Sequence, residues 1–438
     1  MARDLLRNII VEIPSIPGNF AKVATVIGEL GGEIGDIKTI KMGTMSTVRD
    51  ISVTCSSKVV LEQIVEGMKN AGEGIDILAV SDDVMHAHEG GKIHMTSRVD
   101  VRSLADLRRV YTPGVANVCL EIEKNPDKAR YFTSIGNSVA IVTDGSAILG
   151  LGNIGPVAGM PVMEGKAVLF DQFVGISGVP ILLNTSDPDE VVETVKHIHQ
   201  SFGAILLEDI GSPHCFEIEE RLKKELQIPV MHDDQHGTAV VTLAAALNAC
   251  RAAGVDLKNA VVGQIGLGAA GLAISRMMME YGVKEMWGTD RQEEATNRLR
   301  EYGGTVLNSV EEIMEKCDIV IATTGVEGLI KPEMVREGQV ILALSNPNPE
   351  IQPKEALKAG AAYAADGRLV NNVLGFPGIF RGVLNAGASA ITYPMMIAAA
   401  EAIVSSTKQG DLVPHPLDPS VHQMVAHAVE RVALSNHS

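Results

Sequence analysis

Residues 260–271 read AVVGQIGLGAAG, and they decide the fold of the C-terminal half of the chain. The apolar residues up to Gln264 predict a strand, and the glycines that follow have the G-x-G-x-x-G spacing of a dinucleotide-binding turn. In such a turn the first glycine permits a tight bend and the second lets the backbone approach a pyrophosphate. The third lets the next helix pack closely against the strand, with its N-terminal N–H groups facing the phosphates. The expected dinucleotide site is Gly266, Leu267, Gly268, Ala269, Ala270 and Gly271.

Asp290 bears on which dinucleotide is bound. It follows a second predicted strand, 285–288, at about the 20-residue separation at which a carboxylate binds the ribose 2′-OH. A carboxylate there repels a 2′-phosphate, so the sequence favours NAD. The neighbouring Arg291 offers a guanidinium that would accept the extra phosphate, so NADP stays open as the alternative.

Strands and helices also alternate on both sides of this segment, which predicts α/β layering around largely parallel sheets. We expect a substrate- and metal-binding unit over residues 93–235, a Rossmann-type unit over 236–390 and a helical segment over 391–438. The expected strands are 138–143, 167–170, 180–183, 204–207, 229–231, 319–322 and 340–344, and the expected helices include 189–200, 216–226 and 238–253.

Residues 8–83 have a different order of elements. Strand 8–13, a helix capped by Asn19, strands 34–41 and 48–54, helix 58–70 and strand 75–80 give βαββαβ, a ferredoxin-like unit. We assign residues 1–85 to this unit and the polar residues 86–92 to a linker.

Composition excludes several classes of protein. The chain has 438 residues, enough for about three domains, with Lys+Arg 37 against Asp+Glu 54 and a net charge of −17 that disfavours nucleic-acid binding. The N-terminus lacks the apolar run of a signal peptide, and no stretch reaches the roughly 18 apolar residues of a membrane helix. The five cysteines are scattered and lack C-x-x-C spacing, so we expect reduced thiols and a cytoplasmic protein.

Acidic residues follow two of the predicted strands, where α/β proteins assemble ligand sites. Glu208 and Asp209 come after 204–207, and Asp233 and Asp234 come after 229–231. Carboxylates that converge repel one another unless a hard cation neutralises them, and oxygen ligands suit Mg²⁺ or Mn²⁺. We therefore expect a divalent metal site.

Eight motifs in order resemble those of the malic enzyme family, in its compact bacterial form. The resemblance covers about residues 111–381 and is far more specific than the glycine turn alone. The motifs are YTPGVA (111–116), TDG (143–145), GLGNIG (150–155), MEGK (163–166), LED (207–209), HDDQHGT (232–238), LSNP (344–347) and NN (371–372).

The resemblance implies metal-dependent oxidative decarboxylation of malate to pyruvate and CO₂, with reduction of a nicotinamide dinucleotide. It implies Lys166 as general base and Tyr111 as general acid, with Asp233 orienting Lys166. Glu208, Asp209 and Asp234 match the metal ligands. Thr112, Asn346, Asn371 and Asn372 match groups that hold the substrate, and Asn346 also borders the cofactor.

The segment TDGSAILG, 143–150, departs from the family. The large eukaryotic enzymes carry a carboxylate-binding arginine where this chain has Ala147, so that contact must come from elsewhere, such as Thr112, the asparagines or a partner subunit. The resemblance implies at least a homodimer.

Residues 8–83 resemble an ACT domain, which binds small effectors; a packing or dimerisation module is the alternative. A non-catalytic sensor that only binds nucleotide is the alternative to an enzyme, and it would need neither Lys166 nor Tyr111.

Overall fold

The computed structural model describes residues 5–148, 151–368 and 370–435. The chain divides into two compact units, Met1–His94 and Met95–Ser438, and each is described by itself. Leu149 and Gly150, which belong to two of the motifs above, lie outside the described residues.

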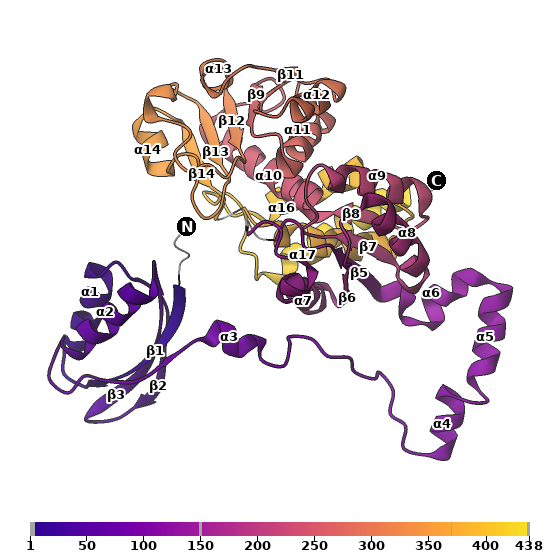
Figure 1. The fold of residues 1–438 in the computed structure, drawn as a ribbon, viewed down its shortest axis with the longest axis horizontal. Helices are drawn as coiled ribbons and strands as arrows, with labels where there is room; N and C mark the ends of the chain where they lie inside the picture. Colours follow the sequence, from indigo (N-terminus) through magenta and orange to yellow (C-terminus); the bar gives the residue numbers. More distant parts are fainter. Residues whose placement is uncertain (1–4, 149–150, 369, 436–438) are drawn as a thin grey trace. The chain divides into compact units, whose positions relative to one another are not determined.

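The first unit is a four-stranded antiparallel sheet with two helices (Figure 1). The strand order β2-β3-β1-β4 confirms the ferredoxin-like prediction. Apolar residues of the helices and strands, among them Ile9, Val23, Ile51 and Ile64, form its core. The elements are β1 (Leu5–Pro14), α1 (Asn19–Glu29), β2 (Glu33–Met42), β3 (Ser46–Cys55), α2 (Lys58–Lys69), β4 (Asp76–Ser81) and α3 (Asp83–His88).

Two local predictions in this unit were wrong. Gly18, not Asn19, is the N-cap of α1, because Gly18 has a left-handed backbone with φ 92° that glycine adopts without a steric penalty. The Asn19 side chain is buried inside the unit and accepts a hydrogen bond from Lys22. The first residues of the expected linker, 86–88, belong to the short helix α3, whose N-cap Asp82 accepts a hydrogen bond from the backbone N–H of Met85.

The second unit begins with short helices and then forms a four-stranded parallel sheet in the order β6-β5-β7-β8. Strands β7 and β8 are neighbours, with Leu207 paired to His232, so their carboxyl ends meet at one edge. The helices are α4 (Leu104–Val110), α5 (Val115–Lys124), α6 (Ala129–Phe132), α7 (Pro156–Val174), α8 (Pro188–Ile198) and α9 (His214–Glu225). The strands are β5 (Ser138–Thr143), β6 (Ser177–Leu182), β7 (Ala204–Leu207) and β8 (Val230–His232).

The predicted strand 167–170 is wrong, because these residues lie in the helix α7. A short apolar run fits a buried helix as well as a buried strand, and periodicity alone does not separate the two. As a result Lys166 lies on a helix and is buried, with 9% of its surface exposed.

A six-stranded parallel sheet follows, in the order β11-β10-β9-β12-β13-β14. Counted from β9, this is the strand order 3-2-1-4-5-6 of a Rossmann fold, which confirms the prediction. Its strands are β9 (Val261–Ile265), β10 (Glu285–Thr289), β11 (Thr305–Val306), β12 (Ile319–Ala322), β13 (Val340–Ala343) and β14 (Tyr363–Asp366). Its helices are α11 (Ala269–Tyr281), α12 (Glu293–Glu301), α13 (Val310–Lys316) and α14 (Pro353–Lys358).

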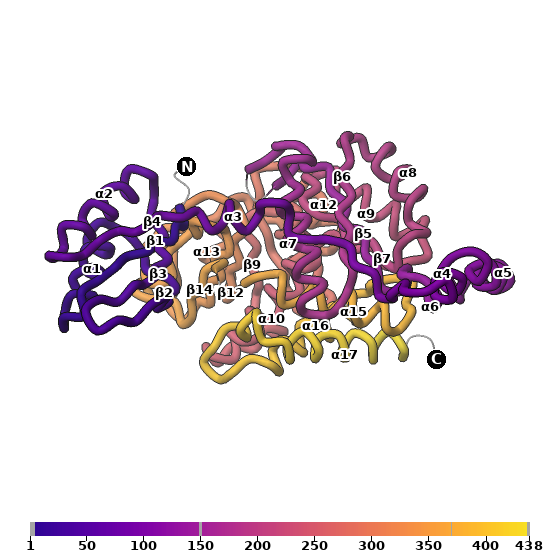
Figure 2. Tube along the Cα trace, turned by 90° about the horizontal axis from the view of Figure 1, so that it is seen from below, coloured from indigo at the N-terminus to yellow at the C-terminus, as the bar shows by residue number. Residues whose placement is uncertain are grey.

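Helix α10 (Asp233–Ala253) starts at the end of β8 and leads to β9, so it joins the two parallel sheets. The chain then returns through α15 (Phe376–Ala386), α16 (Tyr393–Ser406) and α17 (Pro419–Ser435). Figure 2 shows α15, α16 and α17 along one side of this unit. Helix α15 packs against α7, which lies more than 200 residues earlier in the chain.

Aromatic contacts hold α15 and α17 against α7. Phe170 of α7 meets Phe376 and Phe380 of α15 edge-on, at 5.0 and 5.4 Å between ring centroids. Phe173 stacks on His422 of α17 at 4.1 Å. Burial of these rings stabilises the contact between α7 and the C-terminal helices.

Two expectations about the whole chain can be compared with the structure. Among the described residues, none of the helices combines the length and the apolar character that crossing a bilayer requires. All five cysteines are free thiols, as expected.

Candidate active site

Lys166 is the centre of a buried charge cluster. Its Nζ lies 2.9 Å from Oε1 of Glu208 and also forms an ion pair with Oδ2 of Asp233. Nζ is 4.5 Å from the centroid of the Phe376 ring, which adds a cation–π contact. The three charged side chains come from α7, the end of β7 and the start of α10, so the fold brings together residues that are far apart in sequence.

The charge state of Lys166 differs from what its expected role requires. Burial alone would lower the pKa of Lys166, but Asp233 and Glu208 outweigh burial and raise it above its ordinary value. Burial in turn raises the pKa of Glu208 and of Asp233. The pKa of Lys166 is thus raised in this structure because the lysine is paired with two carboxylates.

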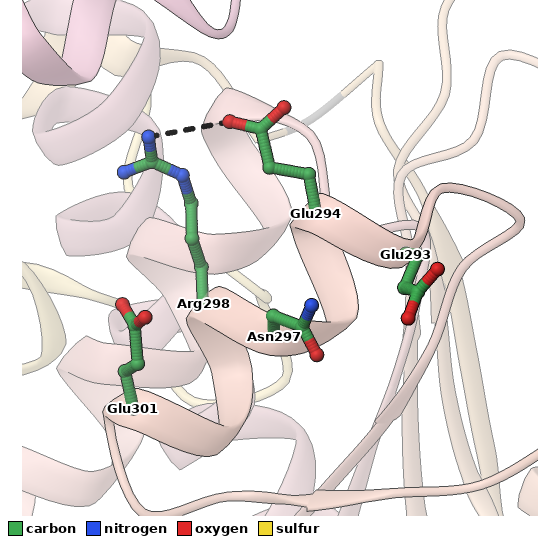
Figure 3. A pocket seen from close by; sticks show the side chains of 5 residues that line it. All are labelled: Glu293, Glu294, Asn297, Arg298 and Glu301. Atoms are coloured by element: carbon green, nitrogen blue, oxygen red, sulfur yellow. Dashed lines mark hydrogen bonds and ion pairs between the residues drawn. The ribbon is translucent and has the colours of Figure 1, made fainter.

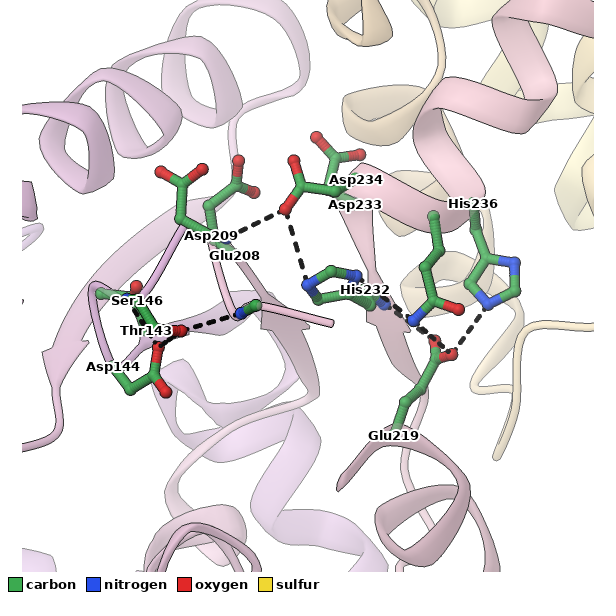
Figure 4. A network of polar contacts seen from close by, with 12 residues as sticks. Thr143, Asp144, Ser146, Glu208, Asp209, Glu219, His232, Asp233, Asp234 and His236 are labelled. Carbon is green, nitrogen blue, oxygen red and sulfur yellow. Dashed lines mark hydrogen bonds and ion pairs between the residues drawn. The ribbon is translucent and has the colours of Figure 1, made fainter. Parts of the chain in front are cut away.

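Glu208, Asp209 and Asp234 lie together beside this lysine. One carboxylate oxygen of each can be chosen so that all three lie within 4.8 Å of one another. Two ligands on opposite sides of Mg²⁺ are about 4.2 Å apart, so only small movements would be needed to bind the ion. Glu208 and Asp209 are buried, and Oε2 of Glu208 has no hydrogen-bond partner among the described residues. Figure 4 shows these side chains next to each other at the ends of β7 and β8.

Asn346, Asn371 and Asn372 make different contacts. Asn372 donates from Nδ2 to Oδ2 of Asp233 at 2.6 Å, so it faces the charge cluster. The side chain of Asn371 instead caps the following 3₁₀ turn η5 (Asn372–Leu374) by accepting from the backbone N–H of Val373 at 3.0 Å. Asn346 is exposed and donates to the carbonyl of Gly367 at 3.1 Å.

A second buried network lies beneath the carboxylates and was missed by the sequence analysis. Oε1 of Glu219, on α9, accepts from the backbone N–H of His232 at 2.8 Å and pairs with Lys223 at 2.9 Å. Oε2 of Glu219 lies 2.9 Å from Nε2 of His236. His232 in turn lies 3.5 Å from Asp234 through Nε2. Glu219 thus ties α9 to the corner between β8 and α10 (Figure 4).

A signal for Glu219 was present in the sequence. It stands four residues after Cys215 and three before Leu222, both of which are buried apolar residues of α9. A charged residue at such a position is buried and needs a partner.

Replacing Glu219 with glutamine should lower the free energy of unfolding by about 2 kcal/mol at pH 7, since glutamine keeps the size but not the charge-assisted hydrogen bonds. Burial alone would raise the pKa of Glu219, but His236 and Lys223 outweigh it and the pKa is lowered. A lowered folded-state pKa contributes stability above the unfolded value of about 4.3 and loses it as the pH falls.

The difference in urea unfolding between the two proteins should therefore shrink below about pH 4. Glu217→Gln, on the exposed side of the same helix, is the control. Equal stability of Glu219→Gln and the unaltered chain at pH 7 would contradict this prediction.

The glycine turn has the geometry that its sequence predicted. Gly266 has φ 87°, and a Cβ at Gly271 would lie 1.9 Å from the carbonyl oxygen of Gly266, so no larger residue fits there. Gly268 is the N-cap of α11. Asp290 accepts from the backbone N–H of Leu267 at 2.7 Å, which places its carboxylate directly at the turn.

Tyr111 and Thr112 are not brought to the carboxylates in this structure. Tyr111 is 67% exposed at the C-terminal end of α4, and Thr112 is exposed beside it. Helices α4 and α5 stand apart from α7 and α10 in both views (Figures 1 and 2). Ala147 lies next to the turn after β7, and its backbone N–H donates to the carbonyl of Asp209 at 3.0 Å.

A hollow on the surface of α12 carries no comparable chemistry (Figure 3). Its lining side chains include an ion pair of Arg298 with Glu294, one turn apart on the helix. Its other lining residues are Glu293, Asn297 and Glu301. Such a hollow is a solvated helix face.

Comparison with known proteins matches both halves of the second unit to domains of one family. Residues 91–223 match the family model described as the malic enzyme N-terminal domain, and residues 289–435 match the malic enzyme NAD binding domain. NAD-dependent malic enzyme 1 of Bacillus subtilis is 66% identical over 435 residues, covering 99% of each chain. The bifunctional malic/malolactic enzyme of the same organism is 43% identical over 385 residues, covering 82% of this chain and 94% of its own.

Solved structures agree. The crystal structure of malic enzyme from Pyrococcus horikoshii has a TM-score of 0.77 and 41% identity, covering 81% of this chain and 90% of its own. NAD-dependent malic enzyme from Thermotoga maritima has a TM-score of 0.75 and 39% identity, covering 80% and 99%. The ordered motifs, the Rossmann sheet and the paired carboxylates all fit these matches, and the chain belongs to the malic enzyme family.

Proposed function

We propose that this protein catalyses the oxidative decarboxylation of (S)-malate to pyruvate and CO₂, with NAD as the oxidant and Mg²⁺ or Mn²⁺ as cofactor. The observation that carries the proposal is the buried cluster of Lys166 with Glu208 and Asp233, beside a set of three carboxylates. A sensor that only bound nucleotide would have no use for such a cluster, because burying it is costly without a function. The similarity to a protein named NAD-dependent malic enzyme supports the choice of reaction and oxidant.

Glu208, Asp209 and Asp234 are the proposed metal ligands. Their oxygen chemistry suits a hard cation, and the partnerless Oε2 of the buried Glu208 fits a missing positive charge. A bound divalent cation would supply Lewis acidity to the carboxylate and C2 oxygen of malate.

Lys166 is proposed to take the proton from the C2 hydroxyl. In the structure it is held as an ammonium by Glu208 and Asp233. A cation held by Glu208 would offset the charge of that carboxylate and so lower the pKa of Lys166 toward the range of a general base. Asp233, held by Asn372, then orients the amine, and Asn372 with Asn346 is proposed to bind the substrate carboxylates. Asn371 and Thr112 are also proposed to contact the substrate; in this structure Asn371 caps a turn and Thr112 is exposed.

Tyr111 is proposed as the acid that protonates C3 of the product enol, at an active site completed by a second copy of the chain. Residues 104–132, which hold Tyr111, expose several large apolar side chains, including Leu104 at 75% and Tyr131 at 84%. Exposed apolar groups of this density favour a protein partner, so we propose a homodimer at least. A monomer in sedimentation experiments that still turns over malate would contradict this part of the proposal.

The dinucleotide is proposed to bind along Gly266–Gly271, with NAD accepting the hydride from C2 of malate. Asp290 stands at the turn through its contact with Leu267, so its carboxylate would oppose a 2′-phosphate. An NADP-preferring enzyme is the alternative, favoured by the adjacent Arg291.

The N-terminal unit is proposed to bind a small effector, as ACT domains do. Its βαββαβ order and the left-handed Gly18 before α1 support this reading. Unaltered kinetics after deletion of residues 1–85, with every tested amino acid and nucleotide, would contradict it. The cytoplasm is the proposed location, supported by the free cysteines.

Product analysis tests the reaction and the oxidant together. With malate, Mn²⁺ and NAD, we expect equal amounts of pyruvate, CO₂ and NADH, and a lower kcat/KM with NADP. Formation of oxaloacetate without CO₂, or of lactate, would exclude the proposed reaction. A higher kcat/KM with NADP would establish the alternative oxidant.

A further inference from the structure

Asp209 has a backbone conformation that residues other than glycine rarely adopt. In the described ranges it is the one non-glycine residue with a positive φ, at 53°. The left-handed region is unfavourable for residues with a Cβ, although aspartate and asparagine tolerate it better than most. Such a conformation persists only where the surroundings impose it. Contacts around the turn must therefore impose this conformation on Asp209.

The loop after β5 makes two hydrogen bonds to the turn that contains Asp209. The backbone N–H of Ala147 donates to the carbonyl oxygen of Asp209 at 3.0 Å. The backbone N–H of Gly211 donates to Oγ of Ser146 at 2.8 Å. These two contacts join the end of β5 to the turn that follows β7, one at the carbonyl of Asp209 itself and one two residues further on.

The Ser146 hydroxyl is itself fixed in direction. It donates to Oδ1 of Asp144 at 2.6 Å, and the backbone N–H of Ser146 donates to the same oxygen at 2.9 Å. Asp144 is only 4% exposed, so water competes little for this carboxylate as a hydrogen-bond acceptor. Because the hydroxyl proton points to Asp144, an oxygen lone pair is left for the Gly211 N–H. Figure 4 shows Asp144 and Ser146 on the side of Asp209 away from Asp234.

The opposite side of the turn is held by the carboxylate set. The backbone N–H of Asp209 donates to Oδ2 of Asp234 at 3.2 Å. Loss of the Ser146 contact would remove one of the hydrogen bonds that hold the turn, which is also held by Asp234, by Ala147 and by the Cys215 N–H that donates to the Gly211 carbonyl. The Asp209 carboxylate would then have more conformations to lose when a cation binds, which weakens binding.

We propose that Ser146 is a positioning residue that, oriented by Asp144, holds the turn 209–211 so that Asp209 is preset to bind the divalent cation. The inference rests on the proposed function, because it assumes that Asp209 is a metal ligand. Ser146 itself touches neither the cation nor malate in this assignment. It acts through the backbone of Gly211, and its effect is therefore on metal affinity before it is on the chemical step.

The test measures Mn²⁺ binding directly, by electron paramagnetic resonance of free Mn²⁺ without malate or NAD. Ser146→Ala should bind Mn²⁺ about tenfold more weakly, as is usual when a group outside the ligand set is removed. The KM for Mn²⁺ should rise by a similar factor, whereas kcat at saturating Mn²⁺ should change little. Ser138→Ala is the control, since Ser138 lies at the other end of β5 and its Oγ donates to the carbonyl of Ser134 at 2.7 Å.

A pair of isosteric variants keeps the test valid if Ser146→Ala folds poorly. Ser146→Thr retains the hydroxyl and should bind Mn²⁺ close to the unaltered chain, whereas Ser146→Val, of the same shape, should show the tenfold loss. Equal affinities for the threonine and valine variants would overturn the inference.

Mn²⁺ binding by Asp209→Asn distinguishes the role of Ser146 from the metal site itself. If the unaltered chain binds Mn²⁺ and Asp209→Asn abolishes binding, but Ser146→Ala and Ser146→Val bind as the unaltered chain does, only the role of Ser146 is wrong. If Asp209→Asn binds Mn²⁺ as tightly as the unaltered chain, or the unaltered chain binds none, the metal site is wrong and the role of Ser146 falls with it.

Discussion

Replacing Lys166 with alanine should reduce kcat/KM for malate by about 10³-fold while NAD and Mn²⁺ still bind, since a positioned general base contributes about 10²- to 10⁴-fold. Lys166 is the amine that meets both Glu208 and Asp233, and Asp233 is held on its other side by Asn372. Removing the amine therefore leaves the ligand set in place but removes the proposed proton acceptor. Steady-state kinetics and NAD titration by fluorescence measure the two effects separately.

Lys196→Ala is a matched control for this variant. Lys196 also pairs with two carboxylates, Glu193 at 2.6 Å and Glu225 at 2.7 Å, but it lies partly exposed at the surface of the same unit. Such a surface pair contributes at most about 1 kcal/mol, and its loss should leave kcat/KM unchanged. Lys166→Met, which keeps most of the apolar stem, separates the missing amine from a packing defect. Near-normal malate oxidation by both Lys166 variants would refute the assignment of the base.

Replacing Asp209 with asparagine should weaken Mn²⁺ binding by at least about 100-fold, more than the loss of a group outside the ligand set usually causes. Asparagine has nearly the same shape and also tolerates the left-handed backbone that this position requires at φ 53°. The turn should therefore keep its conformation, and the lost charge should be the main change. A Mn²⁺ titration checks the loss of affinity, and malate kinetics with and without excess Mn²⁺ check whether added metal restores turnover.

Chelation gives the same information without a substitution. Treatment with EDTA should abolish turnover, and added Mg²⁺ or Mn²⁺ should restore it, because the proposed site draws its charge balance from the ion. Asp171→Asn, which alters an exposed carboxylate in the last turn of α7, should respond to EDTA and to added metal as the unaltered chain does. Turnover that survives complete metal removal would contradict the function proposed for the three carboxylates.

Local sequence patterns were sufficient to predict much of the fold and part of the candidate site. The glycine turn needs a strand before it and a helix after it, so the Rossmann order around β9 was predictable from one short stretch. Glu208 and Asp234 could be expected to meet because carboxyl ends of neighbouring parallel strands share an edge, and β7 and β8 are neighbours. Spacing along the chain was informative wherever a backbone constraint forced the residue type.

The remaining features depend on contacts between distant segments. Lys166 was expected near a strand, but the apolar residues after it are buried in a helix by Phe376 and Phe380, which lie about 200 residues later. The choice between Asn371 and Asn372 depends on a turn that no local pattern specifies. The raised pKa of Lys166 follows from two carboxylates on other elements, and burial alone would have predicted the opposite direction.

The hydrogen bond from Asn372 to Asp233 has a consequence for how the protein is made. During synthesis, residues 95–235 leave the ribosome well before Asn372 and the helices α15 and α17 that pack on α7. The nascent chain must therefore carry an unfinished charge cluster around Lys166 and Asp233 while the six-stranded sheet is translated. A fragment that stops at residue 235 would lack both the amide on Asp233 and the aromatic cover of Lys166, so the two halves cannot be exchanged as independent modules.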